Sequence, residues 1–98
     1  MNRIAVIGAG YVGLTTAACF THLGHDVVCA DIDPDRVEAL QQGRLPIVED
    51  GLEALVADGL HTGRLRFVLG AAEAASHGDF TYLCVPTPQD ADGAAVSM

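Results

Sequence analysis

The chain of 98 residues contains no lysine and no tryptophan, and its five arginines are outnumbered by thirteen carboxylates. Its formal net charge of −8 excludes the clustered positive charge that nucleic acids and anionic membranes bind. The sequence also shows no charged leader with a cleavage site, and no apolar run of the roughly 18 residues that a membrane span needs. We therefore predict no nucleic-acid partner, no membrane span and a cytoplasmic location. An anionic ligand would have to be held by backbone N–H groups.

Cysteine is scarce, odd in number and widely spaced. Cys19, Cys29 and Cys84 each lie in an apolar stretch, and no CxxC pair or metal-ligand spacing is present. This pattern predicts three reduced core residues and no metal site.

The most informative segment is IAVIGAGYVG, residues 4–13, in which four apolar residues run directly into three glycines. Gly8 permits a tight strand-to-helix turn, Gly10 lets the backbone approach a pyrophosphate, and Gly13 lets the helix pack closely on the sheet. The unpaired N–H groups of the helix's first turn, with the positive end of its dipole, form an anion site. The segment indicates a dinucleotide-binding βαβ unit.

An acidic residue follows at the spacing that such a unit requires. The apolar run 26–30 ends at Asp31, about 20 residues after the glycines, where a carboxylate accepts hydrogen bonds from the adenosine ribose. The alternative is a solvated or helix-capping carboxylate. A 2′-phosphate beside Asp31 would meet like charge, which favours NAD over NADP. Arg36 leaves NADP open, because its guanidinium either pairs with such a phosphate or lies solvated on the next helix.

Glycine and proline divide the rest of the chain into short elements. Asp33 and Pro34 suit a helix N-cap and first turn, and predict a helix to about residue 42. Leucines and a valine at helical spacing predict a further helix that begins near residue 52 and ends before Gly63. The remaining elements are a strand at 65–69, a helix from 71 to about 77 and a strand at 80–85.

This order of elements predicts an α/β fold with a Rossmann-type doubly wound parallel sheet. Residues 1–98 would form the N-terminal part of that domain, with four strands in the order 3-2-1-4. Ligands of such sheets bind beyond the carboxyl ends of the strands, where the strand order reverses. We expect the fourth strand to be buried on both faces, as parallel strands usually are. The first helix is expected to bury the stripe Val12, Thr16, Cys19, Phe20 and Leu23.

Two prolines flank Thr87 in the segment that leaves the fourth strand at this crevice. They fix the backbone there, so Thr87 either presents its hydroxyl or N–H to a cofactor or belongs to a rigid turn without ligand contact.

Several short sequence segments (blocks), taken in their order along the chain, together resemble one protein family. The chain resembles the N-terminus of UDP-glucose/GDP-mannose dehydrogenases over essentially its whole length, and the last block resembles the UDP-glucose branch. Asp50 departs from the family pattern, which usually has proline at this position. The blocks are Gly8–Leu14, Gly24–Val27, Asp31–Asp33, Leu45–Leu52, Gly63–Leu65 and Val85–Pro88.

The resemblance implies roles for individual residues. Tyr11 and Val12 would lend backbone N–H groups to the pyrophosphate, and Asp31 would hold the adenosine ribose. Arg36 matches a basic position that contacts the same end of NAD, and Thr87 matches a threonine that lines the cofactor cleft.

The resemblance also implies an activity. Such enzymes oxidise the C6 alcohol of a nucleotide sugar such as UDP-glucose to a carboxylate by two hydride transfers to NAD, through a cysteine-bound thiohemiacetal and thioester, for polysaccharide biosynthesis. The family's catalytic cysteine, lysine, asparagine and acid lie downstream, so this chain would contain no catalytic residue and be inactive alone. None of its cysteines or histidines matches a catalytic position.

Three interpretations of the chain's function therefore remain open. The chain is the NAD-binding part of a nucleotide-sugar dehydrogenase, a stand-alone NAD-binding module, or part of another Rossmann enzyme of the 3-hydroxyacid type. Because a four-strand half-domain leaves one strand edge unpaired, we expect a homo-oligomer, and expect the isolated chain to form dimers or aggregates.

Overall fold

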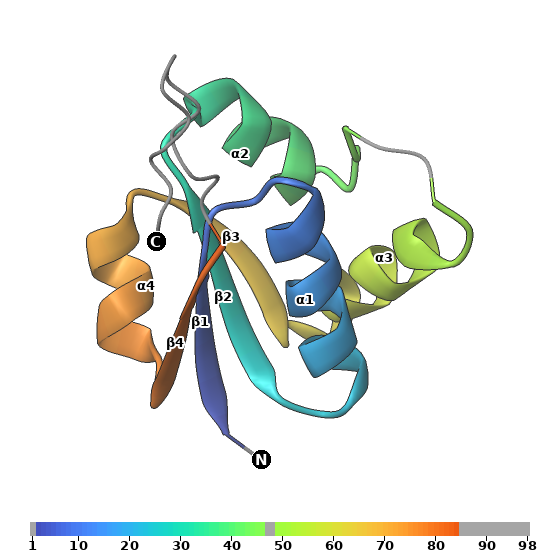
Figure 1. Cartoon of the computed structure of the whole chain (residues 1–98). Helices are drawn as coiled ribbons and strands as arrows, with labels where there is room; N and C mark the ends of the chain where they lie inside the picture. The colour runs from blue at the N-terminus through green and yellow to red at the C-terminus, as the bar shows by residue number, and fades with distance from the viewer. Residues whose placement is uncertain (1, 47–48, 85–98) are drawn as a thin grey trace, which may run out of the picture.

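The computed structural model describes residues 2–46 and 49–84, so Thr87 and the proline segment around it lie outside the described residues. The elements alternate in the predicted order (Figure 1). They are β1 (Arg3–Ile7), α1 (Tyr11–His22), β2 (Asp26–Asp31), α2 (Pro34–Gln41), α3 (Leu52–Thr62), β3 (Leu65–Leu69), α4 (Ala71–His77) and β4 (Phe80–Leu83).

The four strands form one parallel sheet in the order β3-β2-β1-β4, which confirms the predicted fold class and strand order. Val6 of β1 shows the register, because it lies beside Cys29 of β2 on one side and Tyr82 of β4 on the other. All strands therefore end at the same edge of the sheet, and β1 and β2 bring the glycine segment and Asp31 together there.

Helices cover both faces of the sheet (Figure 1). Alternate residues of β1 point to opposite faces, so Ile4 and Val6 join the larger core under α1, α2 and α3, whereas Ala5 joins a smaller core under α4. The smaller core contains mainly alanine and valine, which lets α4 lie close to the sheet. The described helices have 7 to 12 residues, and none in that part of the chain is long and apolar enough to cross a membrane.

Helix α1 packs on the sheet through the face opposite to the expected stripe. Val12 and Leu23 are 61% and 70% exposed, Cys19 is exposed, and Phe20 is only partly buried. Small side chains let the helix approach the sheet closely, and this contact outweighs the larger apolar residues of the other face. The buried face consists of Gly13, Leu14, Ala17, Ala18 and Thr21.

Strand β4 also differs from the expectation of burial on both faces. All four residues from Phe80 to Leu83 are exposed, and Leu83 reaches 74%. No strand of the described residues lies beyond β4, so it is an edge strand with one unpaired side. Val85, the expected last residue of this strand, lies outside the described residues.

Candidate functional site

The glycine segment makes a tight turn from β1 into α1. Gly8 has a φ of +106°, which suits glycine, and its N–H donates to the carbonyl of Ala30 at 2.7 Å. A Cβ on Gly13 would lie 1.7 Å from the carbonyl oxygen of Gly8, a distance that no side chain permits. Gly13 therefore lets the first turn of α1 lie directly on the glycine turn, whereas the sequence had predicted close packing on the sheet.

The N-terminus of α1 is prepared for an anion. Its N-cap, Gly10, has no side chain to bond the free N–H groups, and the first turn carries no acidic residue. The other described helices differ, because Asp33 caps α2 and the first turns of α3 and α4 carry Glu53 and Glu73. The N–H groups of the first turn and the helix dipole thus favour negative charge at α1.

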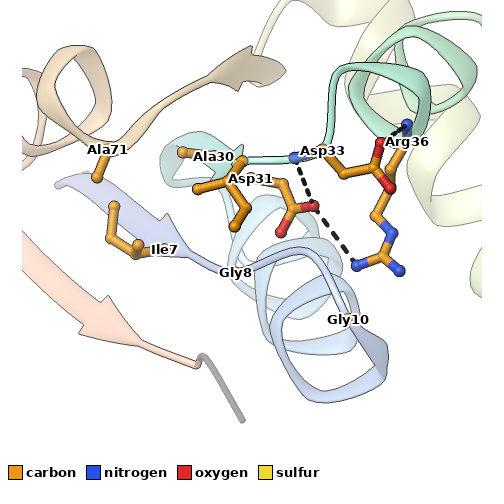
Figure 2. A pocket seen from close by; sticks show the side chains of 9 residues that line it. Ile7, Gly8, Gly10, Ala30, Asp31, Asp33, Arg36 and Ala71 are labelled. Carbon is orange, nitrogen blue, oxygen red and sulfur yellow. Dashed lines mark hydrogen bonds and ion pairs between the residues drawn. The ribbon is translucent and has the colours of Figure 1, made fainter.

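A cavity of about 470 Å³ lies at the carboxyl ends of β1 and β2, beside this helix end (Figure 2). A Cβ on Gly10 would meet no atom within 4 Å, so the backbone is open on this side. The cavity is lined by Ile7, Gly8, Gly10, Ala30, Asp31, Ile32, Asp33, Arg36 and Ala71. Apolar walls with a few polar groups suit a nucleoside, and the adjacent helix end suits its phosphates.

Asp31 is one of the two carboxylates that line the cavity, with Asp33, and its side chain is only 11% exposed. One carboxylate oxygen, Oδ1, accepts from the N–H of Ala9 at 3.2 Å. The other, Oδ2, accepts from the N–H of Asp33 at 3.4 Å and from Nη1 of Arg36 at 3.5 Å (Figure 2). The carboxylate is therefore held by the folded chain, neither solvated in a loop nor capping a helix.

Arg36 is placed by the cap of α2. The Asp33 side chain accepts from the N–H groups of Asp35 and Arg36 at 3.0 and 3.3 Å, and Pro34 occupies the first turn, as predicted. This cap directs the Arg36 guanidinium back toward Asp31, where it remains 39% exposed. Arg36 was expected either to pair with a 2′-phosphate or to lie solvated on the next helix; in the structure it instead pairs with Asp31 at 3.5 Å.

The loop before α3 also reaches the N-terminus of α1. The Glu49 carboxylate near the Tyr11 hydroxyl raises the pKa of Tyr11 above its ordinary value of 10.0, through hydrogen bonding and through its negative charge. The phenol therefore stays neutral at physiological pH and serves as a donor. The tyrosine ring itself is about half exposed.

The three cysteines differ in their surroundings. Burial raises the pKa of the Cys29 thiol to about 12, with the charge of Asp31 adding to the effect, so the reactive thiolate is absent at neutral pH. Cys84 is partly buried, whereas Cys19 is exposed and contradicts its expected place in the core. Among residues 2–46 and 49–84, no group of three or more potential ligands gathers to hold a metal ion.

The structure brings most of the predicted site residues together. Gly8, Gly10, Asp31 and Arg36 line one cavity, Gly13 supports the turn beneath it, and Tyr11 and Val12 begin the helix that points at it. Sequence reasoning missed the other lining residues, among them Ala71, whose only signal is its place two residues beyond the carboxyl end of β3. It also missed the Ala9 N–H, since a backbone donor leaves no trace in a side-chain pattern.

Parallel sheets with a glycine-rich turn after the first strand and an acid at the end of the second bind dinucleotides, and this chain is such a domain. It belongs to the UDP-glucose/GDP-mannose dehydrogenase family, whose NAD binding domain matches residues 2–97. The cofactor of the domain is therefore NAD. The family match leaves the 3-hydroxyacid-type alternative without support.

Relatives of known name agree with this family. The chain is 45% identical to UDP-glucose 6-dehydrogenase of Pseudomonas aeruginosa over 93 residues. This alignment covers 95% of this chain and 20% of that protein. It is 43% identical to GDP-mannose 6-dehydrogenase of Pseudomonas putida over 91 residues. That alignment covers 93% of this chain and 21% of the relative. The chain thus spans about a fifth of the length of the curated relatives it matches.

Solved structures show the same fold. A ternary complex of GDP-mannose dehydrogenase from Pseudomonas aeruginosa superposes with a TM-score of 0.87 at 40% identity, over 93% of this chain and 21% of that one. UDP-glucose dehydrogenase from Pyrobaculum islandicum gives a TM-score of 0.84 at 44% identity, over 90% of this chain and 20% of that one.

Proposed function

We propose that this chain is the NAD-binding part of an enzyme that oxidises the C6 alcohol of UDP-glucose to the carboxylate of UDP-glucuronate, with two NAD consumed. One observation carries the binding part of this proposal. The uncapped N-terminus of α1 and the buried carboxylate of Asp31 border the same cavity, so a phosphate site and a ribose site lie next to each other.

The residues of the site have separable tasks. We assign the backbone N–H groups of Tyr11 and Val12 to the pyrophosphate, because they open a helix that lacks a side-chain cap. Asp31 accepts from the adenosine ribose, and Arg36 balances its charge from the rim of the cavity. The nicotinamide ring of bound NAD supplies a hydride acceptor. No described residue of this chain takes part in the bond-breaking chemistry under this proposal.

The choice of UDP-glucose rests on similarity alone. The identity to UDP-glucose 6-dehydrogenase of Pseudomonas aeruginosa is 45%, against 43% to the GDP-mannose enzyme of Pseudomonas putida. The resemblance of Val85–Pro88 to the UDP-glucose branch adds to this choice. GDP-mannose is the competing substrate.

We also propose that residues 1–98 are the N-terminal portion of a larger NAD-binding domain, with substrate and catalytic domains elsewhere in a longer protein. The unpaired side of β4 supports this, because a doubly wound sheet continues beyond its fourth strand. A stand-alone NAD-binding module is the alternative function, and it would bind NAD without any downstream chemistry.

The deciding experiment compares the longer protein with this chain. We expect the longer protein to form NADH on addition of UDP-glucose, with two NADH per sugar, and to form far less with GDP-mannose. The isolated chain should bind NAD in a calorimetric titration but form no NADH with either sugar. Efficient turnover of GDP-mannose would overturn the substrate, and absence of NAD binding by both proteins would overturn the proposed function.

Self-association is a further part of the proposal. Phe80, Tyr82 and Leu83 expose apolar surface on an edge strand, which favours pairing with another chain. Sedimentation of the isolated chain should show a dimer or larger species, and a clean monomer at all concentrations would contradict this.

A further inference from the structure

The second N–H of the glycine turn is not available to a ligand. Ala9 is 1% exposed, and its N–H donates to Oδ1 of Asp31 at 3.2 Å. The preceding N–H, that of Gly8, donates to the carbonyl of Ala30 at 2.7 Å. Both bonds tie the turn to the end of β2, so the first amides left for phosphate are those at the start of α1.

The Asp31 carboxylate accepts hydrogen bonds from three donors. Ala9 donates to Oδ1, whereas Asp33 and Arg36 donate to Oδ2. A carboxylate has about four acceptor positions, so three donors orient it and still leave capacity for a ribose hydroxyl. Hydrogen bonds to an ionised acceptor are stronger than neutral ones, and partial burial strengthens them further.

The bond from the Ala9 N–H to Asp31 matters because of where Ala9 lies in the turn. Ala9 lies between Gly8, where the backbone turns, and Gly10, which is the N-cap of α1. Neither glycine has a side chain to hold it in place. Backbone bonds hold the N–H of Gly8 and the carbonyl of Gly10, to Ala30 and Leu14, and the Asp31 carboxylate is the side chain that holds the peptide between them.

We propose that Asp31 is a positioning residue for the phosphate-binding turn, in addition to its part in holding the ribose. Its carboxylate fixes the Ala9 peptide and thereby sets the direction of the N–H groups that follow. The proposal rests on the proposed NAD-binding function only for its effect on affinity, because the Ala9 to Asp31 bond exists without a ligand. Removal of this carboxylate should therefore weaken binding even of ligands that lack ribose hydroxyls.

The ligand-free test measures the Ala9 amide by nuclear magnetic resonance. We expect Asp31→Ala to speed hydrogen exchange at Ala9 by about tenfold or more, after correction for global stability. Arg36→Gln is the matched control, because it removes a bond to Oδ2 and leaves the Ala9 bond in place. Unchanged Ala9 exchange in a folded Asp31→Ala protein would overturn the proposal.

A second measurement needs no variant, in case Asp31→Ala does not fold. In the wild-type chain, the Ala9 amide proton and the Asp31 carboxyl carbon should shift together, with one midpoint, as the pH is lowered. A carboxyl that titrates while the Ala9 amide stays constant would contradict the proposal.

The binding test separates the two roles of Asp31. ADP and 2′,3′-dideoxy-ADP carry the same phosphates, but only ADP offers ribose hydroxyls. Asp31→Ala should weaken both, and a role confined to the ribose would leave 2′,3′-dideoxy-ADP unaffected, which would overturn the proposal. If the wild-type chain binds neither, the proposed function fails, and the ligand-free measurements still decide the role of Asp31.

Discussion

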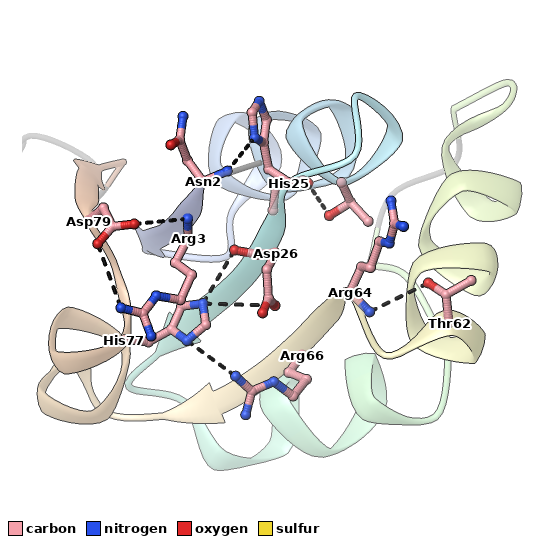
Figure 3. Close-up of polar contacts among 11 residues, drawn as sticks. Asn2, Arg3, His25, Asp26, Thr62, Arg64, Arg66, His77 and Asp79 are labelled. Carbon is pink, nitrogen blue, oxygen red and sulfur yellow. Dashed lines mark hydrogen bonds and ion pairs between the residues drawn. The ribbon is translucent and has the colours of Figure 1, made fainter.

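The amino end of the sheet pairs its polar groups within the chain, whereas the carboxyl end also presents the N–H groups of a helix without a side-chain cap. At the amino end, side chains bond to one another and to the backbone (Figure 3): Nε2 of His77 lies 3.3 Å from the carbonyl of Asp26, and Nδ1 lies 3.4 Å from Arg66. Arg3 and Asp79 pair nearby. At the carboxyl end, the first turn of α1 has no side-chain cap and faces a cavity.

We infer that the paired side chains of the amino end support the fold, whereas the uncapped N–H groups of α1 are available to a ligand. An arginine only donates, so His77 accepts at Nδ1 and donates from Nε2 to β2, which joins α4 to two strands. Among the described residues, Oδ1 of Asp26 is the one buried side-chain nitrogen or oxygen atom without a hydrogen bond. Nε2 of His77 lies 3.8 Å from it. The amino end is nearly complete in itself, whereas the carboxyl end has room and uncapped N–H groups for the phosphate that we propose.

The largest expected effect comes from Gly13→Ala. The added Cβ would meet the Gly8 carbonyl oxygen at 1.7 Å, so the helix or the turn must move. We expect a loss of about 3 kcal/mol or more in the free energy of unfolding. Urea unfolding measures it, and a loss below about 1 kcal/mol would contradict the close packing described here.

Gly10→Ala is the matched change in the same motif, and it should act on binding rather than on folding. Its Cβ would meet no protein atom within 4 Å, but it would occupy the side from which phosphates approach. We expect at most about 1 kcal/mol of lost stability, because alanine is a poorer N-cap than glycine. NAD affinity in calorimetry should fall about tenfold or more, and unchanged affinity would contradict the assignment of this helix end.

At the amino end, His77→Ala should give the opposite result. Loss of its contacts with Asp26 and Arg66 should cost about 1 kcal/mol of stability and leave NAD affinity within about twofold. His22→Ala, at an exposed position near the end of α1, is the control that should change neither quantity. A large loss of NAD affinity in His77→Ala would show that the two ends are not independent.

The smallest effect is expected for Arg3→Gln. The side chains of Arg3 and Asp79 are 61% and 52% exposed, so solvent screens their pairing at 3.7 Å. The loss of stability should stay below about 0.5 kcal/mol. A loss as large as that of His77→Ala would mean that exposed pairs, and not the partly buried histidine, hold the amino end together.

Much of the fold follows from local signals. Glycines placed the limits of β3 and α4 correctly, and Asp33 with Pro34 predicted the start of α2. The order of the strands followed from the alternation of elements and the handedness of their connections. These features depend on residues close together in sequence or on rules common to all parallel sheets.

The errors have a physical cause in packing. The buried face of α1 contains glycine and alanine, which count for little in a hydrophobic stripe but permit close contact with the sheet. The exposure of β4 depends on which strand lies beside it, and its own apolar sequence does not report that. In the site, Asp31 and the glycines were predictable from spacing, whereas the Ala9 N–H bond required coordinates.

The most direct test of the account is a titration of the chain with NAD, followed by the backbone amide resonances of the described residues. We expect saturable shifts at Gly10, Tyr11, Val12 and Asp31, at the carboxyl end of the sheet, and none at Asp26 or Asp79, at the amino end. Saturable shifts at the amino end without shifts at Gly10 to Val12 would contradict the central claim that the carboxyl end is the one built for a dinucleotide.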